Sequence, residues 1–388
     1  MYPITAAVAA VLSGTARIGA HIDVMRAGAI IPGFGGIPVE RASMTADRTS
    51  SNRRTGSVKI SDPVGTYAPK LQTDPLGANG NEVRLYCDVF IPGVANGFPI
   101  PMGTFTIVET VVVDTGADFN ITVELSDRSW ALQQRGFVLP YTIAAAQNVD
   151  VAIMAMLNAA WSGNGRLISS LAPVDALTPS PAGIVQPGSS GDPWTQATRL
   201  GDAAGIELFF DALGILNGRP TPDPSQQAPV WSVTELAPTG LKGVTAKFTR
   251  KGVSSAWEIV GKGVKARAAT GGTKSIVGPT SISYVQDNDP RSPTYAQGPF
   301  GVVPQITKST LVTSKAQGLE MASTQRAQQK GMASAVTISI LPNPALDIDD
   351  VVYVQRSRMG LAGLYVIDSI TTDVHHDATM QIAVRTVI

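Results

Sequence analysis

Residues 118–127 alternate between polar and apolar side chains, and this alternation constrains the fold more than any other feature of the chain. The apolar positions would share one face of a strand: Phe119, Ile121, Val123 and Leu125. A period of two is typical of a β-strand with one face in a core and the other in water. The strand-like segment 104–114 precedes it, and the short turn 115–117 joins the two segments. We therefore predict a β-hairpin over residues 104–126.

Further strand-like segments make both ends of the chain rich in β-structure. In the first third, clusters of Gly, Pro and Asn separate four of them: 16–28, 37–47, 56–63 and 81–92. In the last third there are six: 255–263, 280–289, 334–344, 349–357, 363–371 and 379–387. Short strands with turns between them are typical of a sandwich or barrel.

The pattern becomes helical after about residue 140. Apolar side chains recur at helical spacing over residues 149–160, which predicts an amphipathic helix packed on a core. These side chains belong to Val149, Ile153, Met156, Leu157 and Ala160. A second helix is predicted from Asp192 as N-cap, with Pro193 at its first position and Gly205 as its terminator.

A third helix is predicted inside the last β-rich region. It begins at Ser314, where the pattern Ser314-x-x-Gln317 forms a capping box, and it stops at Gly331. The opening residues 1–14 predict a short packing helix. A secretion signal is the alternative there, although the first basic residue is Arg17 and the usual basic leader is missing.

Three segments of the middle region complete the prediction. Residues 206–218 predict a strand, a bend at 211–214 and a second strand. Residues 162–192 are rich in Ser, Pro and Gly and predict a loop, and residues 218–229 predict a proline-broken linker. The whole chain is thus mainly β with some α, an α+β fold, and its two β-rich ends suggest two similar units.

The charge composition limits the possible partners. Charged residues make up 15% of the 388 residues, with 30 basic and 30 acidic side chains, against about 25% in ordinary soluble domains. A general binder of nucleic acid or anionic membrane would have a basic excess. The scarcity of charge favours a surface covered by partners, and a charge-poor monomer is the alternative. No apolar run approaches the roughly 20 residues of a membrane span.

The single cysteine, Cys87, excludes an intramolecular disulfide and any zinc site with several cysteine ligands. Folding in a reducing cytoplasm is therefore expected. Histidine is also scarce, since the chain has only three: His21, His375 and His376. The adjacent pair would point to opposite faces of a strand, so we predict a polar turn there, with a metal site as the alternative.

Motifs of enzyme chemistry are incomplete. The serines of "PGSSGD" at 187–192 lack the spacing of a nucleophile elbow, and in "TGGTKS" at 270–275 a threonine interrupts the phosphate-loop pattern. The segments "DNDP" at 287–290 and "DIDD" at 347–350 lack the glycine and distant glutamate of a calcium loop and predict turns. We predict no catalytic, cofactor-binding or metal-ligating residue.

A paired-carboxylate hydrolase stays open as an alternative, because the separation of two carboxylates depends on the fold. We select no such pair from the acidic residues near turns: Asp114, Asp127, Asp211 and Asp287.

Several stretches, taken in order, resemble one known family. They are "RRTGSVKISDP" (53–63), "DPLGANGNEVRLY" (74–86), "MGTFTIVET" (102–110), "VELSDRSWALQQRGF" (123–137), "LGDAAGIELFFDALGIL" (200–216), "PVWSVTE" (229–235), "AWEIVGKG" (256–263), "DNDPRSPTYAQGPFG" (287–301) and "PNPALDIDDVVYV" (342–354). Their joint order resembles the tail-hub or minor tail proteins, similar to baseplate hub proteins, of long-tailed phages that infect actinobacteria.

This resemblance implies two tube-type β-barrel or sandwich domains. The expected division is 1–140 for the first, 141–245 for a mixed intervening region, and 246–388 for the second, with one helix at about 314–330. The stretch 287–301 is then a loop of the second domain, stiffened by its prolines. Tyr295 and Phe300 are the candidate anchors of this loop into a core or a neighbouring subunit.

The resemblance also implies a non-enzymatic, structural role without cofactors. A homotrimer would close the tail tube at the tip of the virion, after assembly in the host cytoplasm, and DNA would pass through the ring without specific binding. The expected partners are the distal tail protein, the tape-measure protein and receptor-binding or other tip proteins. A cell-surface polysaccharide hydrolase and another tail part, such as a distal tail ring, are the alternatives.

Overall fold

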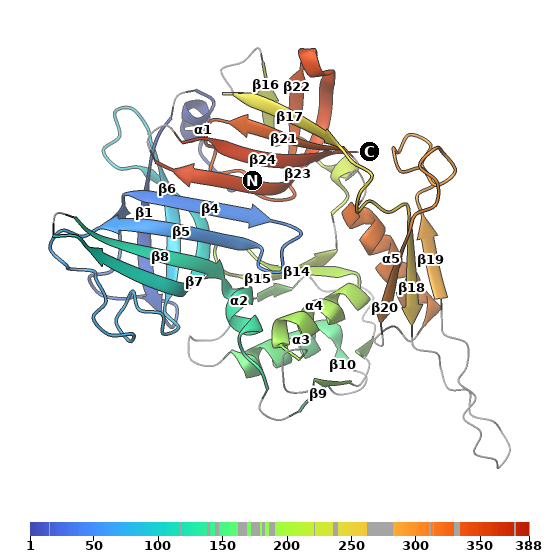
Figure 1. The fold of residues 1–388 in the computed structure, drawn as a ribbon, viewed down its shortest axis with the longest axis horizontal. Coiled ribbons are helices and arrows are strands. Elements are labelled where there is room, and N and C mark those ends of the chain that lie inside the picture. The colour runs from blue at the N-terminus through green and yellow to red at the C-terminus, as the bar shows by residue number, and fades with distance from the viewer. Residues whose placement is uncertain are drawn as a thin grey trace.

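The structure is a computed structural model in which strands predominate (Figure 1). It describes residues 1–388 except 15, 117, 138–139, 144–146, 162–168, 172–178, 181–182, 186–190, 221, 236–239, 262–281, 310–311, 313, 330–333, 376–377 and 388. The prediction of a mainly β chain with some helix is confirmed at this level.

Six strands of the first third form what we call the first strand set. In chain order they are β1 (Arg17–Arg26), β4 (Arg41–Asp47), β5 (Arg54–Ser61), β6 (Glu82–Phe90), β7 (Phe98–Asp114) and β8 (Phe119–Asp127). In space they lie in the order β4-β5-β8-β7-β6-β1, all antiparallel. Two short strands, β2 (Ala29–Ile30) and β3 (Ile37–Val39), pair with β1.

The predicted hairpin is β7–β8, and the predicted apolar face is confirmed. Ile121, Val123 and Leu125 are buried, and Phe119 at the start of β8 is half-buried. Gly116 takes a φ of 77° in the turn, a left-handed conformation that glycine adopts without steric cost. The sequence did not indicate the β-bulge between Ile107 and Glu109, where β7 shifts register against β8.

Six strands of the C-terminal part form the second strand set. In chain order they are β16 (Trp231–Thr234), β17 (Gly243–Phe248), β21 (Ser334–Ile340), β22 (Val351–Arg356), β23 (Leu361–Val374) and β24 (Met380–Thr386). Their order in space is β17-β21-β24-β23-β22-β16. The sequence pattern located four of them and missed β16 and β17.

The two strand sets are joined edge to edge into one 14-stranded sheet. Strand β4 pairs antiparallel with the second half of β23, from Ser369↔Asp47 to Val374↔Ala42, and Figure 1 shows the two sets meeting there. One core runs under both sets, with buried residues such as Met44, Phe105 and Ile382. The N-terminal and C-terminal thirds therefore share a sheet and a core.

A helical layer occupies the middle of the chain and lies below the large sheet in Figure 1. It consists of α2 (Arg128–Gln133), α3 (Val149–Ala160) and α4 (Pro193–Ala203), and the hairpin of β14 (Ile206–Phe210) and β15 (Leu216–Pro220) packs with it. The predicted inner face of α3 is confirmed, since Ile153, Met156 and Leu157 are fully buried.

The predicted caps of α4 are also confirmed. The Asp192 side chain accepts from Thr195 N at 2.8 Å, and Pro193 stands in the first turn. Gly205 follows the helix with a φ of 72°.

Two predicted segments in the middle region need correction. Within the predicted loop 162–192 there are short strands at β11 (Ser169–Leu171), β12 (Pro179–Ser180) and β13 (Gly183–Val185). They pair with β15, with β10 (Gln147–Asn148) and with β9 (Tyr141–Ile143), so tertiary partners override the loop-like composition. The predicted linker 218–229 starts inside β15 and contains a 3-10 turn, Pro224–Gln226.

A separate three-stranded sheet is inserted between β17 and β21 of the second strand set. It contains β18 (Ala256–Gly261), β19 (Ile282–Gln286) and β20 (Pro304–Ser309), and α5 (Lys315–Gln329) packs on it around Trp257. The predicted capping box is confirmed, because Ser314 Oγ accepts from Gln317 N at 3.2 Å and Gln317 Oε1 accepts from Ser314 N at 3.3 Å. The predicted stop at Gly331 lies outside the described residues.

The short packing helix near the start is α1 (Ala6–Leu12), which buries Val8 and Leu12. None of the helices in the described ranges has the length and hydropathy needed to cross a membrane. The domain limits at residues 140 and 245 stay a prediction.

Candidate functional site

A group of ion-paired charges, mostly buried, lies where the two strand sets and the middle hairpin meet. We call it the junction cluster and define it by five residues: Arg48, Arg53, Glu207, Arg219 and Asp349. The turn between β4 and β5 supplies Arg48 and Arg53, the β14–β15 hairpin supplies Glu207 and Arg219, and the loop before β22 supplies Asp349. Three regions distant in sequence are thus held by one set of ion pairs.

Asp349 is the centre of the junction cluster. Its Oδ2 lies 2.8 Å from Arg53 Nη2 and 2.6 Å from Arg219 Nη2, and its Oδ1 lies 3.3 Å from Arg48 Nε. Glu207 adds contacts of 3.1 Å to Arg53 and 3.4 Å to Arg48. Asp349 has a φ of 69°, a left-handed conformation that Asp tolerates better than most residues.

The electrostatics of the cluster favour ionised side chains. Burial alone would raise the pKa of Asp349, but Arg48, Arg53 and Arg219 together hold it below its usual value. Burial lowers the pKa of Arg48, and the charges of Glu207 and Asp349 more than compensate for it. Since buried charges are tolerated only when paired, these residues depend on one another.

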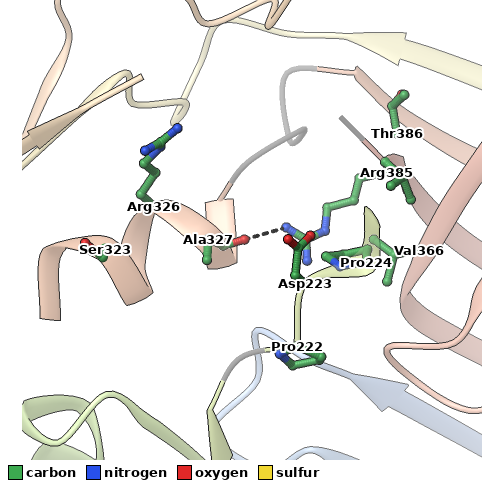
Figure 2. Close-up of a pocket in the computed structure, with 10 residues that line it drawn as sticks. Pro222, Asp223, Pro224, Ser323, Arg326, Ala327, Val366, Arg385 and Thr386 are labelled. Carbon is green, nitrogen blue, oxygen red and sulfur yellow. Dashed lines mark hydrogen bonds between the residues drawn. The ribbon is translucent and has the colours of Figure 1, made fainter. Parts of the chain in front are cut away.

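Arg385 on β24 extends this charge network toward α5. Its Nε lies 3.0 Å from Asp368 Oδ1, and its Nη1 donates to the carbonyl oxygen of Ala327 at 3.3 Å. Figure 2 shows this bond beside a hollow of about 250 Å³ that Pro222, Asp223, Arg326 and Arg385 line. The last turn of α5 is thereby tied to the large sheet.

Two further arginines tie loops to the first strand set. Arg54 pairs with Asp347 at 2.5 Å. Arg128 donates to both carboxylate oxygens of Glu82, at 2.6 and 2.8 Å, and to the carbonyl oxygen of Gly214 at 2.5 Å. Such bidentate pairs fix geometry, which fits a structural joint.

A hollow of about 450 Å³ beside the junction cluster holds two unusual carboxyl groups. Burial raises the pKa of Asp202 to about 6, and the nearby charge of Glu207 adds to the shift. Burial also raises the pKa of Asp368 to about 6, against the opposing effect of Arg385. Asp368 is the bulge residue of β23, between Ile367 and Ser369.

The four acidic residues considered for a hydrolase are each engaged locally. Asp127 caps α2 through Ser129 N, and Asp114 accepts from Gly116 N in the hairpin turn. Asp211 accepts from Leu213 N and Ile215 N, and Asp287 accepts from two hydroxyl groups of its own loop. In none of these contacts is one of the four carboxylates the partner of another.

The segments considered for metal binding are turns, as predicted where they are described. The carboxylates of "DIDD" pair with cations: Asp347 with Arg54, Asp349 with the junction cluster and Asp350 with the N-terminus. No group of three His, Cys, Asp or Glu side chains suited to a metal occurs among the described residues. His376, "TGGTKS" and most of "PGSSGD" lie outside the described residues.

The loop 287–303 is organised by Asp287, which is 1% exposed. Its Oδ2 accepts from Ser292 Oγ and, at 2.6 Å, from Thr294 Oγ1. The candidate anchors Tyr295 and Phe300 are half-buried. Tyr295 OH donates to Gln297 at 3.0 Å, and the Arg250 guanidinium lies 5.0 Å from the centre of the Phe300 ring. These contacts lie within the chain and do not test a contact with a neighbouring subunit. The interface role of Tyr295 and Phe300 therefore stays a prediction.

Sequence reasoning missed the junction cluster. Two of its three parts are visible as "DRTSSNRR" at 47–54 and "DIDD" at 347–350, one basic and one acidic. Their separation of about 300 residues gave no reason to pair them, and only the β4–β23 ladder brings them together.

Comparisons with known proteins identify the fold. No family model matches the chain, and no curated protein sequence matches it. The 43 kDa tail protein of prophage MuSo2 from Shewanella oneidensis is 15% identical over 94% of this chain and 98% of that chain, with a TM-score of 0.59. A tail protein from Neisseria meningitidis MC58 is 12% identical over 95% and 96% of the two chains, with a TM-score of 0.61.

A component of the E. coli type VI secretion system, described as similar to the T4 bacteriophage tail proteins gp27 and gp5, is 10% identical. The match covers 96% of this chain and 74% of that chain, with a TM-score of 0.50. At these identities the likeness is one of fold, and this chain has the fold of these phage tail proteins.

Proposed function

We propose that this chain is a structural hub protein of a phage tail tip, acting as a homotrimer that closes or continues the tail tube. The β4–β23 ladder carries the proposal. It joins two strand sets of matching order side by side, as two neighbouring segments of a tube wall would be joined. Three chains would then supply six such segments, and contacts of this heterologous kind close into a ring.

The two faces of the large sheet support a tube. On β4, Ala42, Met44 and Ala46 are buried in the core, and the residues between them carry polar or charged side chains. The same polar face continues across neighbouring strands in Ser57, Thr122, Thr371, Thr337 and Thr245. We propose that this face lines the lumen. The same face also carries the cations Arg41, Lys59 and Lys247 and the carboxylates Glu124 and Asp373. A lining of hydroxyl groups and charges of both signs would let DNA pass without strong phosphate binding.

The role is proposed to be non-enzymatic, with no cofactor. The acidic and basic side chains at the centre of the molecule hold segments of the chain together, as the junction cluster does. The proposed partners are the distal tail protein, the tape-measure protein and receptor-binding or other tip proteins. The proposed place is the tail tip of the virion, reached by assembly in the host cytoplasm.

Immunogold electron microscopy of the source virions tests the proposal. Antibody raised against this chain should label the tail tip, and antibody first absorbed with the purified chain serves as the matched control. Label along the shaft, or on no particle, would contradict a tip protein. Native mass spectrometry of the complex should give a trimer of the 40.5 kDa chain, whereas a hexamer would favour a distal tail ring.

A further inference from the structure

The two strand sets follow the same plan in chain order as well as in space. Strands β1, β4, β5, β6, β7 and β8 occupy the positions of β16, β17, β21, β22, β23 and β24. The last position differs in direction, because β16 runs parallel to β22 whereas β1 runs antiparallel to β6. Both long strands carry a bulge at the matching place, after Ile107 in β7 and after Ile367 in β23. The pairings therefore align the two sets residue by residue. Each residue of β7 matches the residue of β23 whose number is higher by 260, as Ile107 matches Ile367.

The alignment exposes one difference between the sets. In β23, the residues after the bulge, Ser369–Val374, pair with β4 along the edge that faces away from β24. In β7, the corresponding residues 109–114 pair with β8, and β6 reaches only as far as Thr106. Within the described chain, no strand occupies the outer edge of residues 109–114.

The strand that matches β4 also has an edge that no described strand occupies. Strand β17 corresponds to β4, pairs with β21 on one side, and ends the path of the large sheet. Its core-facing residues, Val244, Ala246 and Phe248, match Ala42, Met44 and Ala46 of β4. The latter three are buried, whereas Phe248 is 80% exposed.

We infer that β17 of one chain pairs antiparallel with residues 109–114 of β7 in a second copy of the same chain. The open edge of β17 in one chain is thus covered by the open edge of β7 in the next chain. The register is the one in which β4 pairs with β23. Opposite pairs would be Val111↔Lys247 and Val113↔Thr245, matching Thr371↔Thr45 and Asp373↔Ser43. The inference deepens the proposed function and rests on it, because a ring of three chains closes through three such contacts.

Side-chain exposure on the two edges agrees with this pairing. Val111, Val112 and Val113 are 43%, 38% and 44% exposed, an apolar row at the end of a hairpin. An exposed, unpaired strand edge with apolar side chains is a ready template for another strand. Pairing would place Phe248 beside Thr110 and Ala246 beside Val112, so each chain would cover the apolar residues of the next.

The backbone of β7 is oriented for the contact. Thr115 N donates to Asp118 O at 3.0 Å in the hairpin turn. Because peptide groups alternate in direction along an antiparallel strand, the N–H of Val112 points away from β8 and toward the open edge. On β23 the carbonyl oxygen of Asp368 likewise accepts from Arg48 N at 3.0 Å, on the side of β4.

Disulfide trapping tests the register. The double variant Val111→Cys with Lys247→Cys should form a covalently closed trimer on oxidation. Thr371→Cys with Thr45→Cys is the matched control within one chain, since their Oγ1 atoms lie 3.4 Å apart. Val111→Cys with Thr245→Cys is out of register and should give about ten-fold less product, because disulfide geometry is strict. The native Cys87 is 1% exposed and does not compete.

Native mass spectrometry of the same samples separates the two proposals. A trimer in which neither cysteine pair cross-links overturns the edge pairing and leaves the hub assembly standing. A monomer with no cross-link at any concentration overturns both. Val112→Pro gives an independent check, because it removes an N–H that points away from β8 and has no strand beside it within the described chain. The folded monomer should persist and the trimer should be lost, and an intact Val112→Pro trimer would overturn the edge pairing.

Discussion

The hairpins β7–β8 and β23–β24 have the same bulged design, yet among the described residues a strand covers the outer edge of β23 alone. On β23 the edge is filled by β4, and a buried charge network surrounds the junction. On β7 the edge carries three exposed valines. The same local structure therefore has a paired edge at the β4–β23 junction, which we call the finished joint, and an unpaired edge on β7. The difference indicates where a neighbouring chain would bind.

The largest expected effect comes from the finished joint. Asp349→Asn keeps a residue that tolerates the left-handed backbone but removes the charge shared by Arg48, Arg53 and Arg219. We expect the free energy of unfolding in urea to fall by about 3 to 5 kcal/mol, as for other broken buried ion pairs. Asp114→Asn at the tip of the open hairpin is the control and should have little effect. An equal loss of unfolding free energy in Asp349→Asn and Asp114→Asn would contradict the difference between the two edges.

The next largest effect is expected from proline at the matching positions of the two edges, which should lower the free energy of unfolding by different amounts. Thr372→Pro removes an N–H that faces β4 and should lower the free energy of unfolding by about 2 to 3 kcal/mol, since it leaves a buried acceptor unpaired. Val112→Pro, at the aligned position on the open edge, should cost the monomer under about 1 kcal/mol. Thr372→Val, which keeps the backbone N–H, controls for side-chain loss. A monomer equally stable with either proline would remove the distinction.

Phe248 should matter to association and little to the monomer. Phe248→Ser removes a side chain that is 80% exposed in the single chain, so urea unfolding should be nearly unchanged. If the side chain is buried at each contact, trimer formation should weaken by about 2 kcal/mol per contact, or about 30-fold. Sedimentation at several protein concentrations measures this change. Val64→Ser is a control at another exposed apolar residue, 86% exposed, outside both edges.

A smaller effect concerns the pH dependence of the finished joint. The pKa values of Asp202 and Asp368 are about 6 in the folded chain, above the ordinary value of 3.8. The folded state therefore binds more protons than the unfolded state between about pH 4 and pH 6, and stability falls as the pH rises through this window. Unfolding in urea should give a higher free energy at pH 5 than at pH 7.

Asp202→Asn isolates one contribution to this slope. The variant should be about 1 kcal/mol more stable than the natural chain at pH 7 and should gain less on acidification to pH 5. The comparison between the two chains is needed because Asp88 raises the pKa of His21, which gives a slope of the same sign. An unchanged difference in stability at the two pH values would show that Asp202 does not titrate in this range.

The sequence by itself determined the local elements wherever a period or a cap was present. Alternation located β8, helical spacing located the buried face of α3, and Asp192 and Ser314 marked helix starts that the structure confirms. These features depend on residues within a few positions of one another, so a single stretch contains the physical information. The mainly β character of the chain followed from the same local patterns.

Tertiary structure decided everything that depends on distant partners. The short strands β16 and β17 lack a strong period and exist as strands beside β22 and β21. The junction cluster joins residues about 300 positions apart, and neither "DRTSSNRR" nor "DIDD" shows its partner. The edge of β7 was also invisible, because an apolar row such as Val111–Val113 is open or buried only according to what lies beside it. The preference of a segment for helix or strand depends on its own residues, whereas the pairing of strands depends on which distant segments lie side by side in the fold.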